Sequence, residues 1–294
     1  MQKQMINYDS PAALKAFLDE RGMAMQKKFG QNFLVNGAAR SRLVDALEIS
    51  ENTTVWEVGP GLGSMTSEIL SRGAKLTAFE IDRGFSAALK EILQDYMKPS
   101  AEKFRLVEGD VLKTWKGEYE ANGLPERFFG NLPYNVAATI VADMISAGVR
   151  FEKGVITVQK EVAQRMTAAP GTEDYSSFSV LCQWAYKVTN VADLAGGSFW
   201  PRPNVDSRAV KFEKREDFPS CKNPELFMKV LRAAFLQRRK TIKNNLSSLS
   251  YCAGKVDEVL GAAGLEPTVR AEVLSVEQLL KLSDVIYDFS EGAK

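Results

Sequence analysis

Histidine is absent from the 294 residues of this chain, and cysteine is scarce. The lack of histidine excludes Ser-His-Asp and Cys-His nucleophile pairs, histidine-ligated zinc and histidine general bases. The three cysteines, Cys182, Cys221 and Cys252, are too widely spaced for a disulfide framework or a zinc pattern. The chemistry of this protein must therefore proceed without imidazole, and we expect it to bind no metal.

Long apolar runs are also missing. No stretch approaches the roughly 20 residues of a membrane-spanning helix, and the N-terminus leads into polar residues without the apolar segment of a signal peptide. With 45% hydrophobic and 26% charged residues, the composition is that of an ordinary globular protein, long enough for one large core and a smaller domain. We therefore expect a cytoplasmic protein without membrane contact.

A large excess of charge is absent too, since the formal net charge is +1. The charges are nevertheless segregated: residues 232–243 carry five basic side chains and no acid, whereas acids predominate beyond residue 255. Local fields decide whether a phosphate backbone is attracted, although a basic run is also typical of a solvated helix face. The expected helix at 225–243 is thus a candidate nucleic-acid contact.

Strand-like and helical segments alternate through the first half of the chain. Short apolar runs typical of strands occur at 55–58, 76–80, 104–107, 128–129 and 155–158. Segments with helical spacing lie between the first and second of these runs and between the second and third. This alternation predicts a parallel, doubly wound α/β sheet of the Rossmann-like type, with right-handed crossovers.

The pattern of the sequence changes from alternating strands and helices to helices alone in the last third of the chain. Two prolines and a short strand at 210–212 close the α/β part, and amphipathic helical patterns follow. Asn223 and Ser275 each precede one of these helices with the pattern of an N-cap. We predict a Rossmann-like domain at 1–212, with an N-terminal helical and basic extension, and a small all-helical domain at 213–294.

A glycine-rich loop with the sequence EVGPGLG, at residues 57–63, follows the first predicted strand and precedes a helix. Loops of this kind let a cofactor approach the backbone, here at Gly59 and Gly61. Pro60 lacks an N–H that a pyrophosphate would use, and Glu57 would repel such an anion. A cofactor with a positive centre and no phosphate fits better, and S-adenosylmethionine, which carries a sulfonium, is one.

Polar side chains follow four predicted strands at the point where each ends: Glu57, Glu80, Asp110 and Asn131. Open α/β sheets bind ligands at the carboxyl edge of their strands, so we expect these side chains to meet around one ligand. Glu80 has the place of a carboxylate that accepts from ribose hydroxyls, and Asp110 can accept from an adenine amine. Each acid alone is typical of a solvated loop, but the set at successive strand ends favours a cofactor site.

The fourth predicted strand runs into Asn131-Leu132-Pro133-Tyr134, and Pro133 must end it because proline donates no ladder hydrogen bond. The Asn131 amide oxygen and the Leu132 or Pro133 carbonyl can accept the two N–H donors of an exocyclic amine, while Tyr134 offers a ring for stacking. This combination suits a flat heterocycle that carries an amine, although one such motif alone is also typical of a polar turn after a core strand.

Six segments occur in order along the chain: KFGQNFL at 28–34, EVGPG at 57–61, NLPY at 131–134, QKEVA at 159–163, FWPRPNVDS at 199–207 and FLQRRK at 235–240. Together they closely resemble the small-subunit ribosomal RNA adenine dimethyltransferase family, over nearly the whole chain after residue 25. The chain departs from the family pattern at Tyr175-Ser176-Ser177, where Tyr-Gly is frequent, a difference that concerns the local loop and not the chemistry.

The resemblance implies an enzyme that uses S-adenosyl-L-methionine to dimethylate N6 of two adjacent adenosines in the 3′-terminal hairpin of small-subunit rRNA. It also implies cofactor contacts by Asn32, Leu34, Gly59, Glu80, Asp110 and Asn131. The expected partner is small-subunit rRNA or the pre-30S particle during ribosome biogenesis, on which the protein acts as a monomer.

Methyl transfer to adenine N6 needs positioning and dipoles instead of a charged base or a metal, which agrees with a histidine-free chain. We expect the acceptors at 131–133 to favour a pyramidal nitrogen, and Tyr134 and Phe199 to sandwich the extruded base. Phe199 alone would be typical of a core residue. Phosphate contacts, which make affinity salt-dependent, are expected from seven basic residues: Lys27, Lys28, Arg202, Arg208, Arg238, Arg239 and Lys240.

Three other interpretations stay open. A large-subunit rRNA adenine methyltransferase of the antibiotic-resistance type would share fold and cofactor, although Leu132 and the segment 201–207 favour the small-subunit enzyme. A non-catalytic rRNA-binding assembly factor would not need the intact 131–134 segment. A nicotinamide dehydrogenase is disfavoured by Pro60 and Glu57.

Overall fold

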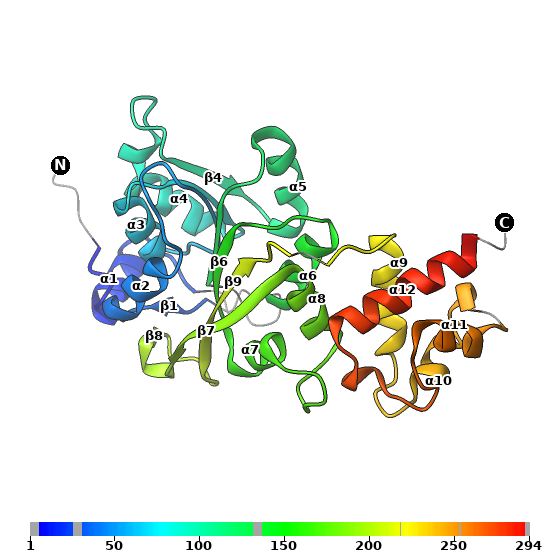
Figure 1. Ribbon diagram of the computed structural model, residues 1–294. Helices are drawn as coiled ribbons and strands as arrows, with labels where there is room; N and C mark the ends of the chain where they lie inside the picture. Colours follow the sequence, from blue (N-terminus) through cyan, green and yellow to red (C-terminus); the bar gives the residue numbers. More distant parts are fainter. Residues whose placement is uncertain (1–5, 26–30, 132–136, 218, 253, 292–294) are drawn as a thin grey trace. The chain divides into compact units, whose positions relative to one another are not determined.

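The computed structural model describes residues 6–25, 31–131, 137–217, 219–252 and 254–291 (Figure 1). The chain forms two compact units. The first consists of Met1–Ile140, Phe151–Ala163 and Thr189–Glu213, and the second of Val141–Arg150, Gln164–Val188 and Lys214–Lys294. The second unit thus combines the C-terminal residues with two segments from the middle of the chain, whereas the predicted division at residues 212 and 213 assumed continuous domains.

A seven-stranded sheet with the order β4-β3-β2-β5-β6-β9-β7 organises the fold. The strands β2 to β6 are parallel to their neighbours, and helices flank them, so the predicted Rossmann-like α/β class is confirmed. The strand bounds are β2 Thr54–Val58, β3 Lys75–Glu80, β4 Phe104–Glu108, β5 Arg127–Asn131, β6 Lys153–Gln159, β7 Tyr186–Leu194 and β9 Ser207–Lys214.

The five strands predicted from the β-α alternation, β2 to β6, are all parallel, but the sheet also contains an antiparallel strand. β9 runs antiparallel to β6, with Gly154 opposite Phe212 and Gln159 opposite Ser207. The apolar pattern at 210–212 predicted a strand but carried no direction, since side chains alternate with the same period in parallel and antiparallel strands. A two-stranded antiparallel ladder of β1 (Phe33–Leu34) and β8 (Phe199–Trp200) is also present.

Helices separate the parallel strands, as the alternation predicted, and α3 and α4 pack against β3. Their bounds are α1 Pro11–Glu20, α2 Gly37–Asp45, α3 Ser64–Ser71, α4 Arg83–Ile92, α5 Val111–Asn122, α6 Ala137–Ser146, α7 Lys160–Thr167 and α8 Ser177–Ala185. The C-terminal helices, yellow to red in Figure 1, are α9 Pro224–Ala234, α10 Ile242–Leu246, α11 Val256–Ala263 and α12 Val276–Glu291.

The central strands β2, β5 and β6 are buried on both faces, which explains their nearly continuous apolar sequences. Phe129 and Val155 belong to a core cluster that also contains side chains of α2, α3 and α4. Phe128, next to Phe129, points to the opposite face, because successive side chains of a strand alternate. There it stacks on Phe151, with 4.8 Å between the ring centroids. The sheet is thus held in position from both sides, and its carboxyl edge is a rigid base for side chains at the strand ends.

The predicted helix caps are confirmed. Asn223 Oδ1 accepts a hydrogen bond from Leu226 N at 2.9 Å at the start of α9. At the start of α12, Ser275 N donates to Gln278 Oε1 at 2.9 Å, and Gln278 N donates to Ser275 Oγ at 3.2 Å, which is the capping box expected from the spacing.

The expectation of one helix over 225–243 was wrong, because α9 ends at Ala234 and α10 begins at Ile242. Asn245 of α10 donates hydrogen bonds to the carbonyls of Ala234 and Gln237, which satisfies acceptors at the end of α9. Thr241 caps α10. The basic residues 238–240 therefore lie in a connecting segment and not on a helix face.

Gly154 of β6 is expected to tolerate no side chain. A Cβ at this position would lie 2.1 Å from Cε2 of Phe212, whose ring packs over the glycine. We expect Gly154→Ala to lower the free energy of unfolding by about 1–3 kcal/mol through overpacking. Gly117→Ala is the matched control, because a Cβ on this α5 glycine meets nothing within 4 Å and should stabilise the helix by roughly 0.5–1 kcal/mol. Denaturant unfolding would measure both, and equal stabilities of the two variants would contradict the packing argument.

Across the described ranges, no helix combines the length and the apolar character needed to cross a membrane.

Candidate active site

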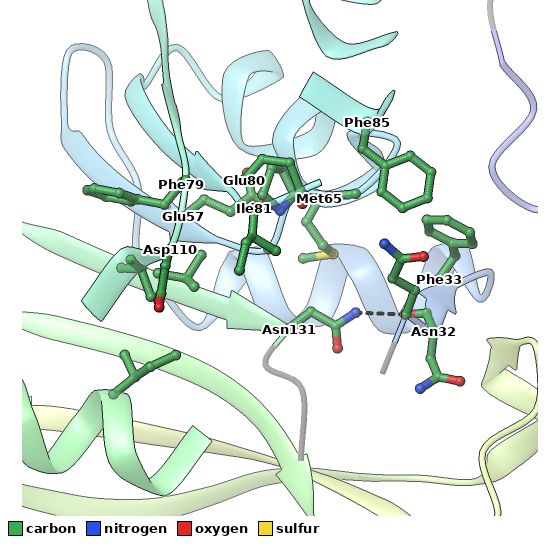
Figure 2. A pocket seen from close by; sticks show the side chains of 18 of the residues that line it. Asn32, Phe33, Glu57, Met65, Phe79, Glu80, Ile81, Phe85, Asp110 and Asn131 are labelled. Carbon is green, nitrogen blue, oxygen red and sulfur yellow. Dashed lines mark hydrogen bonds between the residues drawn. The ribbon is translucent and has the colours of Figure 1, made fainter. Parts of the chain in front are cut away.

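A cavity of about 200 Å³ lies at the carboxyl edge of the parallel strands in the first unit. Its lining comes from the glycine-rich loop, the ends of β3, β4 and β5, and the segment that leads into β1. Figure 2 shows these side chains around one space. The strand order β4-β3-β2-β5 explains the grouping, since it brings the four strand ends next to one another.

The polar side chains expected at successive strand ends do come together here. Asp110 follows β4, Glu80 and Asn131 end β3 and β5, and Glu57 is the next-to-last residue of β2. The spatial order of these strands is β4-β3-β2-β5, and all four side chains line the cavity (Figure 2). The arrangement gives the cavity three carboxyl groups and one amide within a single wall.

The glycine-rich loop has backbone angles that only glycine adopts without strain. Gly59 and Gly61 line the cavity and have φ angles of 73° and 58°, in the left-handed region that side chains disfavour. A Cβ on Gly61 would also lie 2.9 Å from Cε1 of Phe33. The loop thus exposes backbone to the cavity, while its Gly61 N–H is directed to Glu80 Oε2 at 3.1 Å.

Glu80 is a buried carboxyl group held by backbone donors. Its Oε2 accepts from Gly61 N, and its Oε1 accepts from Asp82 N at 2.8 Å. Burial raises the pKa of Glu80 to about 7, although these two hydrogen bonds act in the opposite direction. The group is therefore fixed in place, and each oxygen keeps a further lone pair.

Glu57 is more deeply buried, at 1% exposed. Burial raises its pKa to about 8, and the neighbouring Glu80 acts in the same direction. Its Oε2 has no hydrogen-bond partner among the described residues. A buried carboxyl oxygen without a donor is costly, so this atom marks a place where a ligand with an N–H group would be favoured.

Asp110 and Asn131 have different local roles. Asp110 caps α5, accepting from Leu112 N at 3.0 Å, and is partly exposed at the cavity. Asn131 is held at both ends of its amide: Nδ2 donates to Asn32 O at 2.9 Å, drawn as a dashed line in Figure 2, and Oδ1 accepts a short hydrogen bond from Thr157 Oγ1.

Other predicted residues lie in different surroundings. Asn32 lines the cavity, whereas the Leu34 side chain is 1% exposed and belongs to the core cluster under α2 to α4. Phe199 belongs to the same cluster and is 4% exposed, opposite Leu34 in the β1–β8 ladder. Five predicted residues lie outside the described residues: Lys27, Lys28, Leu132, Pro133 and Tyr134.

The basic residues predicted to contact RNA differ in how they are engaged. Arg208 forms a two-pronged ion pair with Asp193. Arg238 pairs with Glu272 at 3.3 Å and also donates to the Glu173 carbonyl. Arg202, Arg239 and Lys240 are exposed, and the latter two form no ion pair within the described part of the chain.

Sequence reasoning missed several residues at the cavity. Ile81 is 46% exposed and lines it beside Glu80, together with Met65 and Phe85. Single apolar residues near strand ends are common, so the sequence carried no signal for them. Thr157, which contacts the cavity residue Asn131 from β6, had a weak signal as a hydroxyl in the otherwise apolar run 155–158. No group of histidine, cysteine or acidic side chains in the described ranges is arranged to hold a metal ion.

Comparison with known proteins places these features in a family. The family described as "Ribosomal RNA adenine dimethylase" matches residues 22–288. A Treponema denticola protein named ribosomal RNA small subunit methyltransferase A is 48% identical over 283 residues, which cover 95% of this chain and 96% of the relative. A Borreliella burgdorferi protein of the same name is 37% identical over 281 residues, covering 96% and 95%.

Solved structures give a consistent result. A dimethyladenosine transferase from Plasmodium falciparum superposes with a TM-score of 0.70 at 25% identity, covering 84% of this chain and 94% of that one. A 23S rRNA methyltransferase reaches 0.62 at 23% identity, covering 86% and 99%, which shows likeness of fold. Because the family match extends over residues 22–288 and the relatives match over nearly their whole length, this chain belongs to the ribosomal RNA adenine dimethylase family.

Proposed function

We propose that this protein uses S-adenosyl-L-methionine to dimethylate N6 of two adjacent adenosines in the 3′-terminal hairpin loop of small-subunit rRNA. The observation that carries the proposal is the cavity in which three carboxyl groups and the Asn131 amide meet, in a chain of this family. The names of the curated relatives support the small subunit, and not the large one, as the source of the substrate. The proposed setting is the cytoplasm, with the pre-30S particle as partner and the protein as a monomer.

The residues at the cavity fit S-adenosylmethionine, which supplies an electrophilic methyl group on a sulfonium. An ammonium group would provide the donor that Glu57 Oε2 lacks, and positive charge offsets the cost of ionising this carboxyl. Glu80 and Asp110 keep acceptor lone pairs for hydroxyl or amine donors. Cofactor contacts by Asn32, Leu34 and Gly59 rest on the family resemblance. The contact by Gly61 rests on the glycine-rich loop, which lines the cavity.

Asn131 is proposed to hold the adenine amine. Its Oδ1 keeps one lone pair beyond the hydrogen bond from Thr157, and this lone pair accepts an N6 hydrogen. The Leu132 or Pro133 carbonyl accepts the other hydrogen. The nitrogen then becomes pyramidal, and its lone pair is no longer delocalised into the ring but faces the methyl group. Tyr134 is proposed to stack on the base. Stacking on Phe199 would require the ring to leave the core, since it is 4% exposed.

The helical domain at 213–294 is proposed to bind RNA phosphates through the segment 238–240. We expect Arg239→Ala combined with Lys240→Ala to weaken RNA binding and to reduce the slope of log K against log [salt] by roughly 0.7–0.9 for each lost phosphate contact. Lys222→Ala is the control, because Lys222 is exposed in the same unit but paired with Asp288. Filter binding at several salt concentrations measures the slopes, and a double variant with the wild-type slope would reject this contact.

Methyl transfer to ribosomal particles tests the function directly. The protein is incubated with radiolabelled S-adenosylmethionine and unmethylated small or large subunits, and primer extension maps the modified positions. We expect label in two adjacent adenosines near the 3′ end of small-subunit rRNA. Label only in large-subunit rRNA would favour the antibiotic-resistance type of enzyme, and binding without any label would favour an assembly factor. Calorimetry with S-adenosylmethionine and NAD separates a methyltransferase from a dehydrogenase.

A further inference from the structure

Thr157 carries a hydroxyl group at a position where packing alone would favour an apolar side chain. It lies in β6 and is 1% exposed. Its register partners are Asn131 in β5 and Ala209 in β9. Side chains two residues apart share a face of the sheet, so Thr157 points to the same side as Val155, into the core cluster under α2 to α4. A hydroxyl buried there costs free energy unless it is hydrogen-bonded.

The partner of this hydroxyl is the Asn131 amide. Thr157 Oγ1 donates to Asn131 Oδ1, while Asn131 Nδ2 donates to Asn32 O. A backbone carbonyl can only accept, so Asn32 O selects the NH₂ end of the amide, and the hydroxyl then holds the oxygen end. Reversal of the amide would place Oδ1 against another acceptor. The last torsion of asparagine is broad in the absence of partners, so these two contacts determine where Oδ1 lies.

We propose that Thr157 is a positioning residue for methyl transfer, whose hydroxyl fixes the Asn131 amide so that the second lone pair of Oδ1 is presented to the target amine. This inference rests on the proposed function, in which that oxygen accepts a hydrogen of adenine N6. An acceptor already held in place needs no reorganisation when the amine arrives. An amide free to turn would have to be ordered in each turnover, which raises the barrier of the chemical step.

Two substitutions separate the hydroxyl from the packing of the side chain. Thr157→Val keeps the shape and removes the hydroxyl, whereas Thr157→Ser keeps the hydroxyl and removes a methyl group. We expect Thr157→Val to lower kcat about 3- to 10-fold, the loss of one hydrogen bond, with the KM values for RNA and cofactor unchanged. Thr157→Ser should restore kcat to near the wild-type value, although its melting temperature should fall because a core methyl is lost. A role in packing alone predicts the opposite order of kcat values.

A spectroscopic measurement without substrate supports the same distinction. The side-chain NH₂ resonances of Asn131, identified by their loss in Asn131→Ala, should shift in Thr157→Val and stay close to wild type in Thr157→Ser. A wild-type kcat in Thr157→Val, or equal losses in both variants, would overturn the positioning role. Failure of the wild-type protein to methylate rRNA would instead overturn the proposed function, and the NH₂ shifts would then show only whether Thr157 holds the amide.

Discussion

Asn131→Ala should lower methyl transfer to small-subunit rRNA by about 10²- to 10³-fold, the loss typical of removing a preorganised polar group from a reacting centre. Asn131 ends β5, lines the cavity and is held at both ends of its amide. Because the phosphate contacts are expected elsewhere, RNA affinity should be retained. Single-turnover transfer of radiolabelled methyl groups measures the rate, and filter binding measures the affinity.

The control for this variant is Asn190→Ala, which removes an exposed amide from β7 and should leave the rate unchanged. The melting temperature must be measured as well, because Asn131→Ala also removes the hydrogen bonds to Asn32 and Thr157. A folded Asn131→Ala protein with a rate within a few-fold of wild type would remove Asn131 from the reaction.

Glu57→Gln should raise the stability of the ligand-free protein at pH 8 and flatten the dependence of stability on pH. Burial, reinforced by Glu80, raises the pKa of Glu57 from an ordinary value of 4.5 to about 8. Between these values the unfolded chain releases the proton while the folded chain keeps it, so stability falls as pH rises. Below about pH 4.5 both states hold the proton, and Glu57 no longer lowers the stability. At pH 8 the stability lost through Glu57 is of the order of a few kcal/mol.

Thermal unfolding of the wild type and Glu57→Gln between pH 4 and pH 9 measures this effect. The variant's advantage should grow from about pH 4.5 to pH 8 and level off above. In the variant, a smaller decline of stability with rising pH should remain, because the pKa of Glu80 is also raised, to about 7. Parallel curves for the two proteins would show that Glu57 is not responsible for the decline.

Much of the site was predictable because it depends on local sequence. Parallel strands expose their carboxyl ends on one edge, so the positions of Glu57, Glu80, Asp110 and Asn131 at four strand ends predicted their meeting in one cavity. Helix caps at Asn223 and Ser275 were equally predictable, since a cap bonds to residues three positions away.

Other features depend on contacts between distant segments, for which the sequence had no signal. The direction of β9 follows from its pairing with β6. The end of α9 at Ala234 involves Asn245 of α10, so a basic run that resembled a helix face is a connection between two helices. Arg238 is engaged by Glu272, which lies 34 positions further along the chain.

The sequence by itself determined the α/β class, the glycine-rich loop and the polar residues at the strand ends. These features depend on short periodicities along the chain and on glycine, whose backbone angles other residues rarely adopt. Only the tertiary structure decided the protonation preference of Glu57 and the orientation of the Asn131 amide. Both depend on surroundings brought together by folding: the first on the removal of water from a carboxyl group, and the second on a hydroxyl and a carbonyl supplied by separate parts of the chain.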